Sequence, residues 1–239
     1  MRSFVLMAFA LLVGTSAVSA GTIKIVPDMN GAYYKSYLTK VSISRDGGAH
    51  YLNNVLAGQY RVKITGGTDP LAKPLRSFLT YCLETDERLT SSTGTIRPLS
   101  SGDDIRGGLG TKRAAEISQL FGRFQKNFNT QVDKTTGTAI ALAIWEIADE
   151  AVGAPLNLST GAFRVRAPAA VLTLAQSYLD ALTNKGPRLT NLYAIVIPKY
   201  QDLLIQKGPP HIVVAEPGVV GLLGLGALGL VAARRRTRR

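Results

Sequence analysis

The sequence TAIALAIWEIADEA, from Thr138 to Ala151, decides the fold of this 239-residue chain. Its apolar side chains would occupy nearly every side of a helix, not a single stripe. They are Ile140, Leu142, Ile144, Trp145 and Ile147. A helix that is apolar all round is buried in a core, so we expect this segment to be the central helix of the protein.

Two further helices are expected, one on each side of this segment. The residues Ile117, Leu120, Phe121, Phe124 and Phe128 recur at spacings of three and four. This spacing is typical of an amphipathic helix whose aromatic stripe faces the core. A third helix is expected from Pro168 to Leu182, because proline favours the first turn of a helix and the sequence NKGP at 184–187 ends one.

Strands are expected before the helices. The segments TIKIV (22–26), VSIS (41–44), YRVKI (60–64) and SFLTYCLET (77–85) are rich in β-branched and aromatic residues. In YRVKI the apolar and charged residues alternate, which places them on opposite faces of a strand. The segment LYAIVIP (192–198) is expected to return to the sheet. The predicted fold class is therefore α+β: antiparallel strands, then a small cluster of three helices and a returning strand.

The stretch from Ser91 to Gly110 is rich in glycine, serine and threonine, and we expect it to be an exposed loop. At its end, the sequence GGLGTK at 107–112 resembles a fragment of a phosphate-binding loop. It lacks the leading glycine of that motif and follows no clear strand, so nucleotide binding is not predicted.

The N-terminus has the pattern of a secretory signal peptide, expected at residues 1–20. Arg2 supplies the positive charge, an apolar run extends from Phe4 to Val13, and small residues precede a cleavage site after Ala20. Cleavage there would leave Gly21 first. An uncleaved anchor is the alternative, but an apolar core of about ten residues is short for a membrane span.

The C-terminus has the pattern of a membrane-inserted tail. An uncharged apolar run at 217–233 would cover roughly 25 Å as a helix, against a hydrocarbon core of about 30 Å. Five arginines follow at Arg234, Arg235, Arg236, Arg238 and Arg239. Clustered arginine stays on the cytoplasmic side, so the body is expected outside. The alternative is a buried core helix. The expected organisation is a domain at 21–198, a linker at 199–214 and the tail at 215–239.

This tail resembles that of bacterial PEP-CTERM proteins, which are exported by Gram-negative bacteria. Glu216 and Pro217 match the last two positions of the Pro-Glu-Pro signature, and Ala215 stands where the first proline is usual. The resemblance implies two processing partners: signal peptidase, and an exosortase, a membrane cysteine protease that removes the tail near the signature. It also implies transient residence in the inner membrane and delivery to the cell envelope, cell surface or extracellular matrix.

A second resemblance concerns the body. Tyr81-Cys82 at a strand end, followed by ALAIWE at 141–146, is similar to the thioester domains of bacterial surface adhesins. In that family a cysteine condenses with a glutamine four residues before the tryptophan, and the bond traps nucleophiles. Here Cys82 and Trp145 match, but Ala141 occupies the glutamine position. The resemblance, over about residues 60–180, implies a thioester-like scaffold without the reactive bond.

Cys82 is the single cysteine of the chain, so no internal disulfide is possible. We expect a buried thiol, because it lies in an apolar segment, with intermolecular pairing as the alternative. Other glutamines are conceivable thioester partners, although none lies at the family's position. They are Gln119, Gln125, Gln131 and Gln176.

Other catalytic or metal-binding patterns are weak. His50 and His211 are the two histidines, and neither has the spacing of a zinc site or a catalytic triad. The candidate acid–base groups for a hydrolase are Glu84, Asp86, Glu87, Asp103, Asp104, Glu146, Asp149 and Glu150. Carboxylates adjacent in sequence are usually solvated surface, which is the preferred interpretation here. No cofactor or metal is expected.

The net charge of +12 overstates the charge of the body, because Arg2 and the five terminal arginines account for six charges and leave +6. No dense basic stripe is present, so nucleic-acid binding is not predicted. The expected function is a non-catalytic binding or structural role at the cell surface or in a biofilm, with a polysaccharide or matrix protein as partner. The alternatives are a secreted or anchored polysaccharide hydrolase and a covalent adhesin using Cys82.

Overall fold

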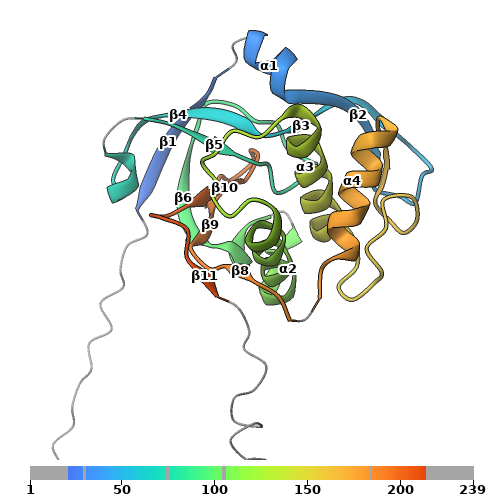
Figure 1. The fold of residues 1–239 in the computed structure, drawn as a ribbon. Helices are drawn as coiled ribbons and strands as arrows, with labels where there is room; N and C mark the ends of the chain where they lie inside the picture. Colours follow the sequence, from blue (N-terminus) through green and yellow to red (C-terminus); the bar gives the residue numbers. More distant parts are fainter. Residues whose placement is uncertain (1–20, 29–30, 74–75, 104–105, 184, 214–239) are drawn as a thin grey trace, which may run out of the picture.

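The computed structural model describes residues 21–28, 31–73, 76–103, 106–183 and 185–213 (Figure 1). The predicted signal peptide with Ala20 lies outside these residues. So do the predicted membrane segment 217–233 and the sorting positions, which are Ala215, Glu216, Pro217, Arg234, Arg235 and Arg236. Within the described part, no helix has the length and apolarity needed to cross a membrane.

A six-stranded antiparallel sheet forms one side of the molecule (Figure 1). Its order is β10 (Leu203–Gln206), β9 (Leu192–Val196), β6 (Ser92–Pro98), β1 (Thr22–Pro27), β4 (Tyr60–Gly67) and β5 (Ser77–Thr80). The chain beyond β5 then meets the opposite edge: Leu204 N–H donates to the Tyr81 carbonyl at 3.0 Å, and Cys82 forms an isolated bridge with Leu203. The sheet therefore curls round until its two edge strands touch.

A second sheet lies on the other side of the central helix. It contains β3 (Leu52–Gly58), β2 (Leu38–Ser44) and β7 (Arg164–Arg166) in that order. A pair formed by β8 (Arg188–Leu189) and β11 (Ile212–Val213) completes the strands. Single turns of 3-10 helix occur at Pro70–Ala72 and Leu99–Ser101, and the short helix α1 spans Gly31–Tyr37.

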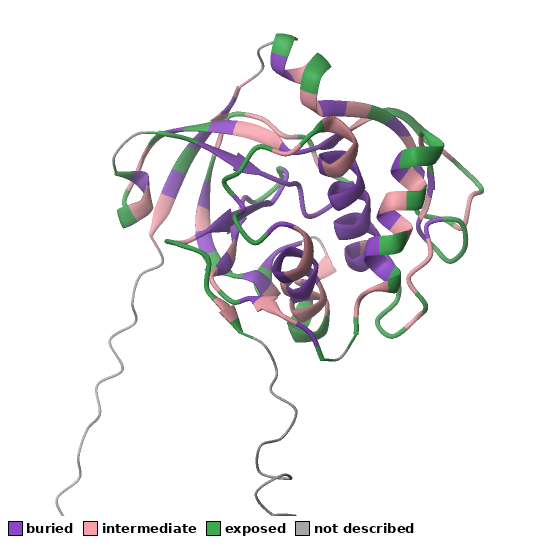
Figure 2. Cartoon of the chain, in the orientation of Figure 1, coloured by how far each residue is buried: buried purple, intermediate pink, exposed green. Residues whose placement is uncertain are grey.

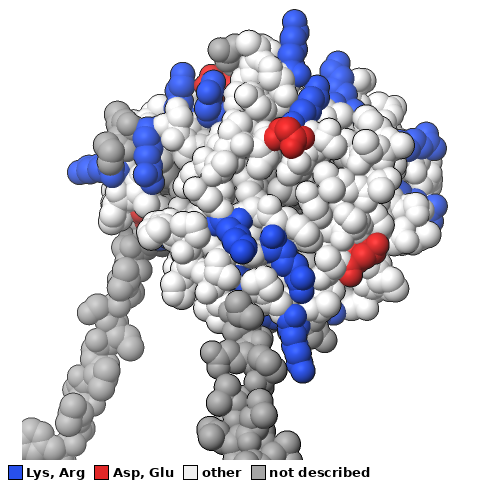
Figure 3. Space-filling model, in the orientation of Figure 1, with Lys and Arg blue, Asp and Glu red and all other residues white. Residues whose placement is uncertain are grey.

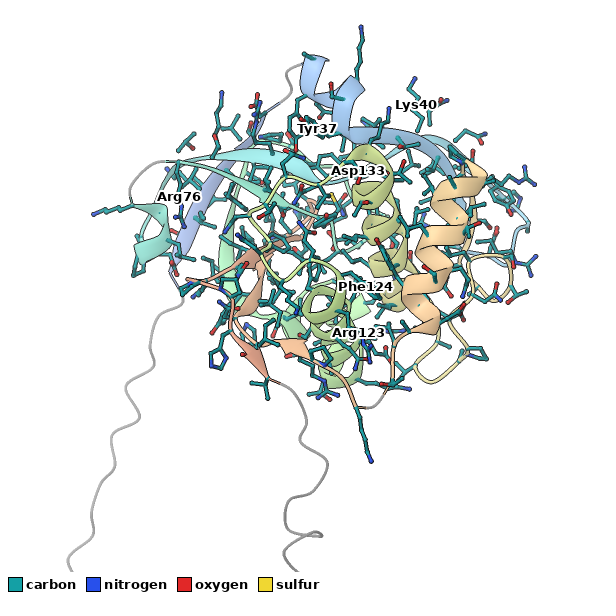
Figure 4. All side chains as sticks on the ribbon, in the orientation of Figure 1. Tyr37, Lys40, Arg76, Arg123, Phe124 and Asp133 are labelled. Carbon is teal, nitrogen blue, oxygen red and sulfur yellow. The ribbon has the colours of Figure 1, made fainter. Side chains whose placement is uncertain are left out.

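The central helix is α3 (Lys134–Asp149), as the sequence predicts. Every residue from Gly137 to Ala148 is buried, and Figure 2 shows α3 buried along nearly its whole length. Asp133, labelled in Figure 4, caps its first turn by accepting a hydrogen bond from Thr136 N–H at 2.9 Å. The helix packs against β3 and against α4 (Ala169–Asp180), whose outer face is exposed. The predicted α+β fold with a buried central helix is confirmed.

The helix α2 (Gly110–Phe124) confirms the predicted aromatic stripe except at its end. Phe124 is the last helical residue, and its ring stacks on Tyr178 of α4 with 4.2 Å between centroids (Figure 4). Phe128, predicted to be helical, lies beyond the helix but is fully buried against Tyr81 and Phe121. Hydrophobic spacing therefore identified a core residue whose backbone had already left the helix.

The prediction of an exposed loop at 91–110 is wrong for its first part. The strand β6 occupies residues 92–98 and lies between β1 and β9, with Ile96 buried. Gly94 allows this close approach, since an added Cβ would lie 2.8 Å from the Val196 carbonyl oxygen and 2.6 Å from Ile195. The glycine that suggested a loop is the residue that lets the neighbouring strand pack.

The expected linker at 199–214 belongs to the domain. It contains β10, whose four residues are all buried, and β11. The domain thus extends at least to Val213 instead of ending at Pro198. The strand expected at 77–85 is shorter than predicted, because β5 ends at Thr80 and the chain then bridges to β10.

Candidate functional site

The three thioester-like positions lie in the core at the contact between α3 and the end of β5. The indole Nε1 of Trp145 donates to the carbonyl of Cys82 at 3.2 Å. Ala141 lies one helical turn before Trp145 and therefore on the same face of α3. All three residues are at most 2% exposed. The side chain at position 141 is a methyl group, so it offers Cys82 no carboxamide with which to form a thioester.

The Cys82 thiol is free and buried. Burial raises its pKa well above the ordinary value, and the nearby Glu84 carboxyl adds to that shift. A protonated, enclosed thiol is a poor nucleophile, as expected for a structural cysteine. Gln125, a conceivable alternative partner, is occupied by other contacts, since its side-chain oxygen accepts from Tyr81 OH at 2.7 Å.

A cavity of about 440 Å³, here called the Trp145 cleft, is lined by Trp145. Its buried floor consists of Glu84, Thr85, Trp145 and Gln201. Its half-buried walls come from three different elements: Tyr34 of α1, Val55 and Leu56 of β3, and Tyr60 of β4. Its exposed rim carries Leu52, Asn53, Asn54 and Arg88. The cleft thus combines aromatic walls with a polar floor, the usual composition of a small-molecule site.

The floor of the cleft is held by hydrogen bonds around Glu84. Its Oε1 accepts from the backbone N–H of Asp202, and Gln201 Nε2 donates to its backbone carbonyl. Asp202 is itself fixed, because its carboxylate accepts from Ile197 N–H at 2.6 Å and from Asp103 N–H at 2.9 Å. Glu84 is therefore anchored through one oxygen to a rigid turn.

The second oxygen of Glu84, Oε2, is buried and has no hydrogen-bond partner in the described part of the chain. Burial raises the pKa of Glu84 to about 9, and the negative charge of Asp202 contributes to the shift. The side chain is consequently a neutral carboxylic acid at physiological pH. A neutral carboxyl can donate a hydrogen bond, which a carboxylate cannot do.

The interpretation of the acidic residues as solvated surface is wrong for most of them. Glu84, Asp103, Glu146 and Glu150 are buried, and the side chain of Asp149 is 2% exposed. Asp104 lies outside the described residues. These carboxyls fall into separate groups that satisfy the backbone or pair with arginine, an arrangement that no local sequence pattern indicates.

One of these groups is centred on Arg106. Its guanidinium pairs with Asp86 at 2.6 Å, with Asp103 at 2.9 Å and with Asp149. Arg45 contacts Asp86 as well. The two arginines offset most of the charge of the three carboxylates, so this group has the composition of a structural ion-pair network.

A second group fastens the loop that follows α3. Glu146 Oε1 accepts from Asn157 N–H at 2.6 Å, and Glu150 Oε2 accepts from Ala162 N–H at 2.8 Å. Burial raises the pKa of Glu146 to about 7. These side chains accept hydrogen bonds from N–H groups of the loop and so hold it against the end of α3.

The remaining candidates do not form a site. His50 bonds to Asp46 at 2.6 Å and His211 to Thr190 at 2.5 Å, both on the surface. No group of three or more potential metal ligands occurs among the described residues. The GGLGTK sequence runs into the start of α2. Figure 3 shows Lys and Arg spread over the visible face without a continuous stripe.

Comparisons with known proteins leave both resemblances untested. No family model matches the chain, and the searches of curated proteins and of solved structures return no match.

Several residues of the Trp145 cleft were not predicted from the sequence. Tyr34 belongs to a seven-residue helix, and Gln201 to the segment expected as a linker. The useful signal for the second was LLIQ at 203–206, an apolar run that is long enough for a short buried strand. Recognising it would have placed Gln201 and Asp202 at the edge of the sheet.

Proposed function

We propose that this chain is an exported protein, sorted by its tail to the cell envelope or extracellular matrix, which binds a surface polymer non-covalently through the Trp145 cleft. The observation that carries the proposal is the cleft with Trp145 in its floor, together with the alanine one helical turn before that tryptophan. Trp145 contacts the Cys82 carbonyl and shares its helix face with Ala141, whose methyl group leaves no electrophile. Recognition in such a site depends on the cleft lining and needs no covalent bond.

Intact mass tests whether binding is non-covalent. The full chain should have the mass of its sequence, less any removed leader and tail, with no loss of the 17 Da that thioester formation releases as ammonia. Incubation with methylamine should add no mass, and Cys82 should be alkylated once urea has unfolded the protein. A methylamine adduct would refute the proposal of an unreactive scaffold.

The C-terminus of the protein recovered from cells tests sorting. A chain ending near Ala215 or Glu216, found in the envelope or matrix, supports processing by an exosortase. Exclusive recovery of membrane-bound protein ending at Arg239 would favour a simple membrane anchor. A matched variant, Pro217→Ala, should leave the tail in place if the signature is recognised.

A hydrolase is the second candidate, and one observation favours it. Glu84 and Glu87 both line the cleft, and a protonated carboxyl beside a second carboxyl is the composition of a glycosidase centre. The test is release of new reducing ends from envelope polysaccharide. Loss of that release in Glu84→Gln, with binding retained, would establish hydrolysis, and no release from the unaltered chain would exclude it for the polymers tried.

A further inference from the structure

The walls of the Trp145 cleft are suited to the faces of sugar rings. Tyr34 and Tyr60 contribute half-buried aromatic rings from two different elements, and Trp145 forms part of the floor. The hydroxyl of Tyr60 is occupied by the Leu56 carbonyl at 2.5 Å, which fixes the orientation of its ring. Aromatic side chains of this kind offer large contact area at low entropic cost, together with a polar edge.

The floor supplies one polar group with an unsatisfied oxygen, the carboxyl of Glu84. Glu84 is 1% exposed, lines the cleft and has the unpartnered oxygen Oε2. Its other oxygen is held by Asp202 N–H, so the carboxyl cannot rotate freely to find another partner. An anchored carboxyl with one unsatisfied oxygen is a costly arrangement in an empty protein, and a ligand hydroxyl would relieve that cost.

The charges around the cleft disfavour an ionic ligand. Asp202 lies behind Glu84, and Glu87 lines the same cavity, so an anion would meet negative charge. Arg88 stands on the exposed rim and would repel a cation at the entrance. The rim also presents the side-chain amides of Asn53 and Asn54, which suit neutral hydroxyl groups.

From these observations we infer that the Trp145 cleft binds a segment of uncharged polysaccharide, with sugar rings against Tyr34 and Tyr60 and a sugar hydroxyl hydrogen-bonded to Glu84. The inference rests on the proposed function and specifies its ligand class. A cavity of about 440 Å³ is large enough for a few sugar units of a longer chain, and its rim is exposed.

Tryptophan fluorescence is the direct readout, because Trp145 is the single tryptophan of the chain and forms part of the cleft floor. The full chain in detergent is titrated with four probes of similar length. These are uncharged hexasaccharides (cellohexaose and laminarihexaose), acidic hexagalacturonate and the cationic glucosamine hexamer. An uncharged hexasaccharide should change the emission in a saturable way, and the two charged probes should bind at least about tenfold more weakly.

Variants locate the binding. Tyr34→Ala should weaken binding of the uncharged probe by about tenfold, and Tyr34→Phe should retain it, because the ring face carries the contact. Glu84→Gln should stay within about threefold of the original affinity, since the amide keeps a hydrogen-bond donor. The matched control is Tyr200→Ala, which removes an exposed tyrosine that is not part of the cleft lining.

The outcomes separate the inference from the proposed function. Preferential binding of an acidic or cationic probe, with sensitivity to Tyr34→Ala, would overturn the ligand class but keep the cleft. Binding to envelope polymer that Tyr34→Ala leaves unchanged would overturn the site while the proposed function stands. A chain that binds no envelope polymer, or that forms a methylamine adduct, would refute the proposed function itself.

Discussion

Glu84 and Glu146 are two buried glutamates with similar hydrogen bonds and pKa shifts but different surroundings. Each accepts one backbone hydrogen bond, from Asp202 N–H and Asn157 N–H respectively, and burial raises the pKa of both. Glu146 is fully covered where the loop after α3 crosses it, whereas Glu84 lines the Trp145 cleft. The comparison teaches that burial alone does not define a site, because a raised pKa becomes useful to a ligand only where a cavity reaches the carboxyl.

The largest expected effect is on stability at the covered glutamate. Glu146→Ala should lower the free energy of unfolding by about 3 kcal/mol, because it leaves Asn157 N–H buried without an acceptor and opens a small cavity. Urea denaturation followed by circular dichroism measures this loss. Glu146→Gln keeps an oxygen acceptor and should cost less than about 1 kcal/mol. Equal stability of the two variants would contradict the role of Glu146 in holding the loop after α3.

Truncation of the glutamate in the cleft should affect binding more, and stability less, than truncation of Glu146. Glu84→Ala should cost about 2 kcal/mol of unfolding free energy, less than Glu146→Ala, because water in the cleft can replace the lost acceptor for Asp202 N–H. Its binding of the uncharged probe should fall by about tenfold. Glu146→Ala should bind normally under conditions where it remains folded. The comparison would be wrong if Glu146→Ala lost binding while folded and Glu84→Ala lost only stability.

Stability should fall as the pH rises above the acidic range. Both glutamates hold their protons more tightly in the folded state, where their pKa values are about 7 and about 9, than in the unfolded chain near 4.5. Their contribution is therefore complete below about pH 4.5 and is lost progressively up to about pH 9. The melting temperature should therefore be lower at pH 9 than at pH 5.

The double variant of Glu84→Gln and Glu146→Gln should flatten this profile, because neither amide titrates. Scanning calorimetry at fixed ionic strength measures both proteins. An unchanged slope in the double variant would assign the pH dependence to other groups.

Long sequence patterns predicted the fold better than short ones did. The apolar circumference of 138–151 predicted α3 because a helix without a polar face has to be buried, and the structure confirms this. Short strands gave weaker signals: β6 resembles a loop because Gly94 and its threonines are needed for close strand packing. The resemblance to thioester domains implied that Cys82 lies beside the helix of Trp145, and in the structure the indole contacts the Cys82 carbonyl.

The cleft itself was beyond prediction from local sequence. Its walls come from α1, β3 and β4, and its floor from residues more than a hundred positions apart, Glu84 and Gln201. Closure of the six-stranded sheet brings Glu84 and Gln201 together. Burial of Glu84 follows from these long-range contacts, so a run of neighbouring carboxyls does not predict it.

The smallest expected effect concerns Cys82. Cys82→Ala should cost about 1 kcal/mol, the loss of a small buried side chain, and should leave binding of the uncharged probe unchanged. Urea denaturation and tryptophan fluorescence measure the two quantities on the same sample. Abolished binding without loss of stability would instead indicate that the thiol takes part in recognition.

The strand order has a consequence for how this chain acquires its structure. The first strand, β1, lies inside the sheet between β4 and β6, and the opposite edges meet only when β10 pairs with the chain after β5. A chain emerging in order from its N-terminus therefore holds an incomplete sheet until residues 203–206 appear. Such distant pairings fold slowly, and the unpaired edge is open to other chains meanwhile. If the protein is exported unfolded, that edge stays open until β10 has left the membrane and paired with the chain after β5.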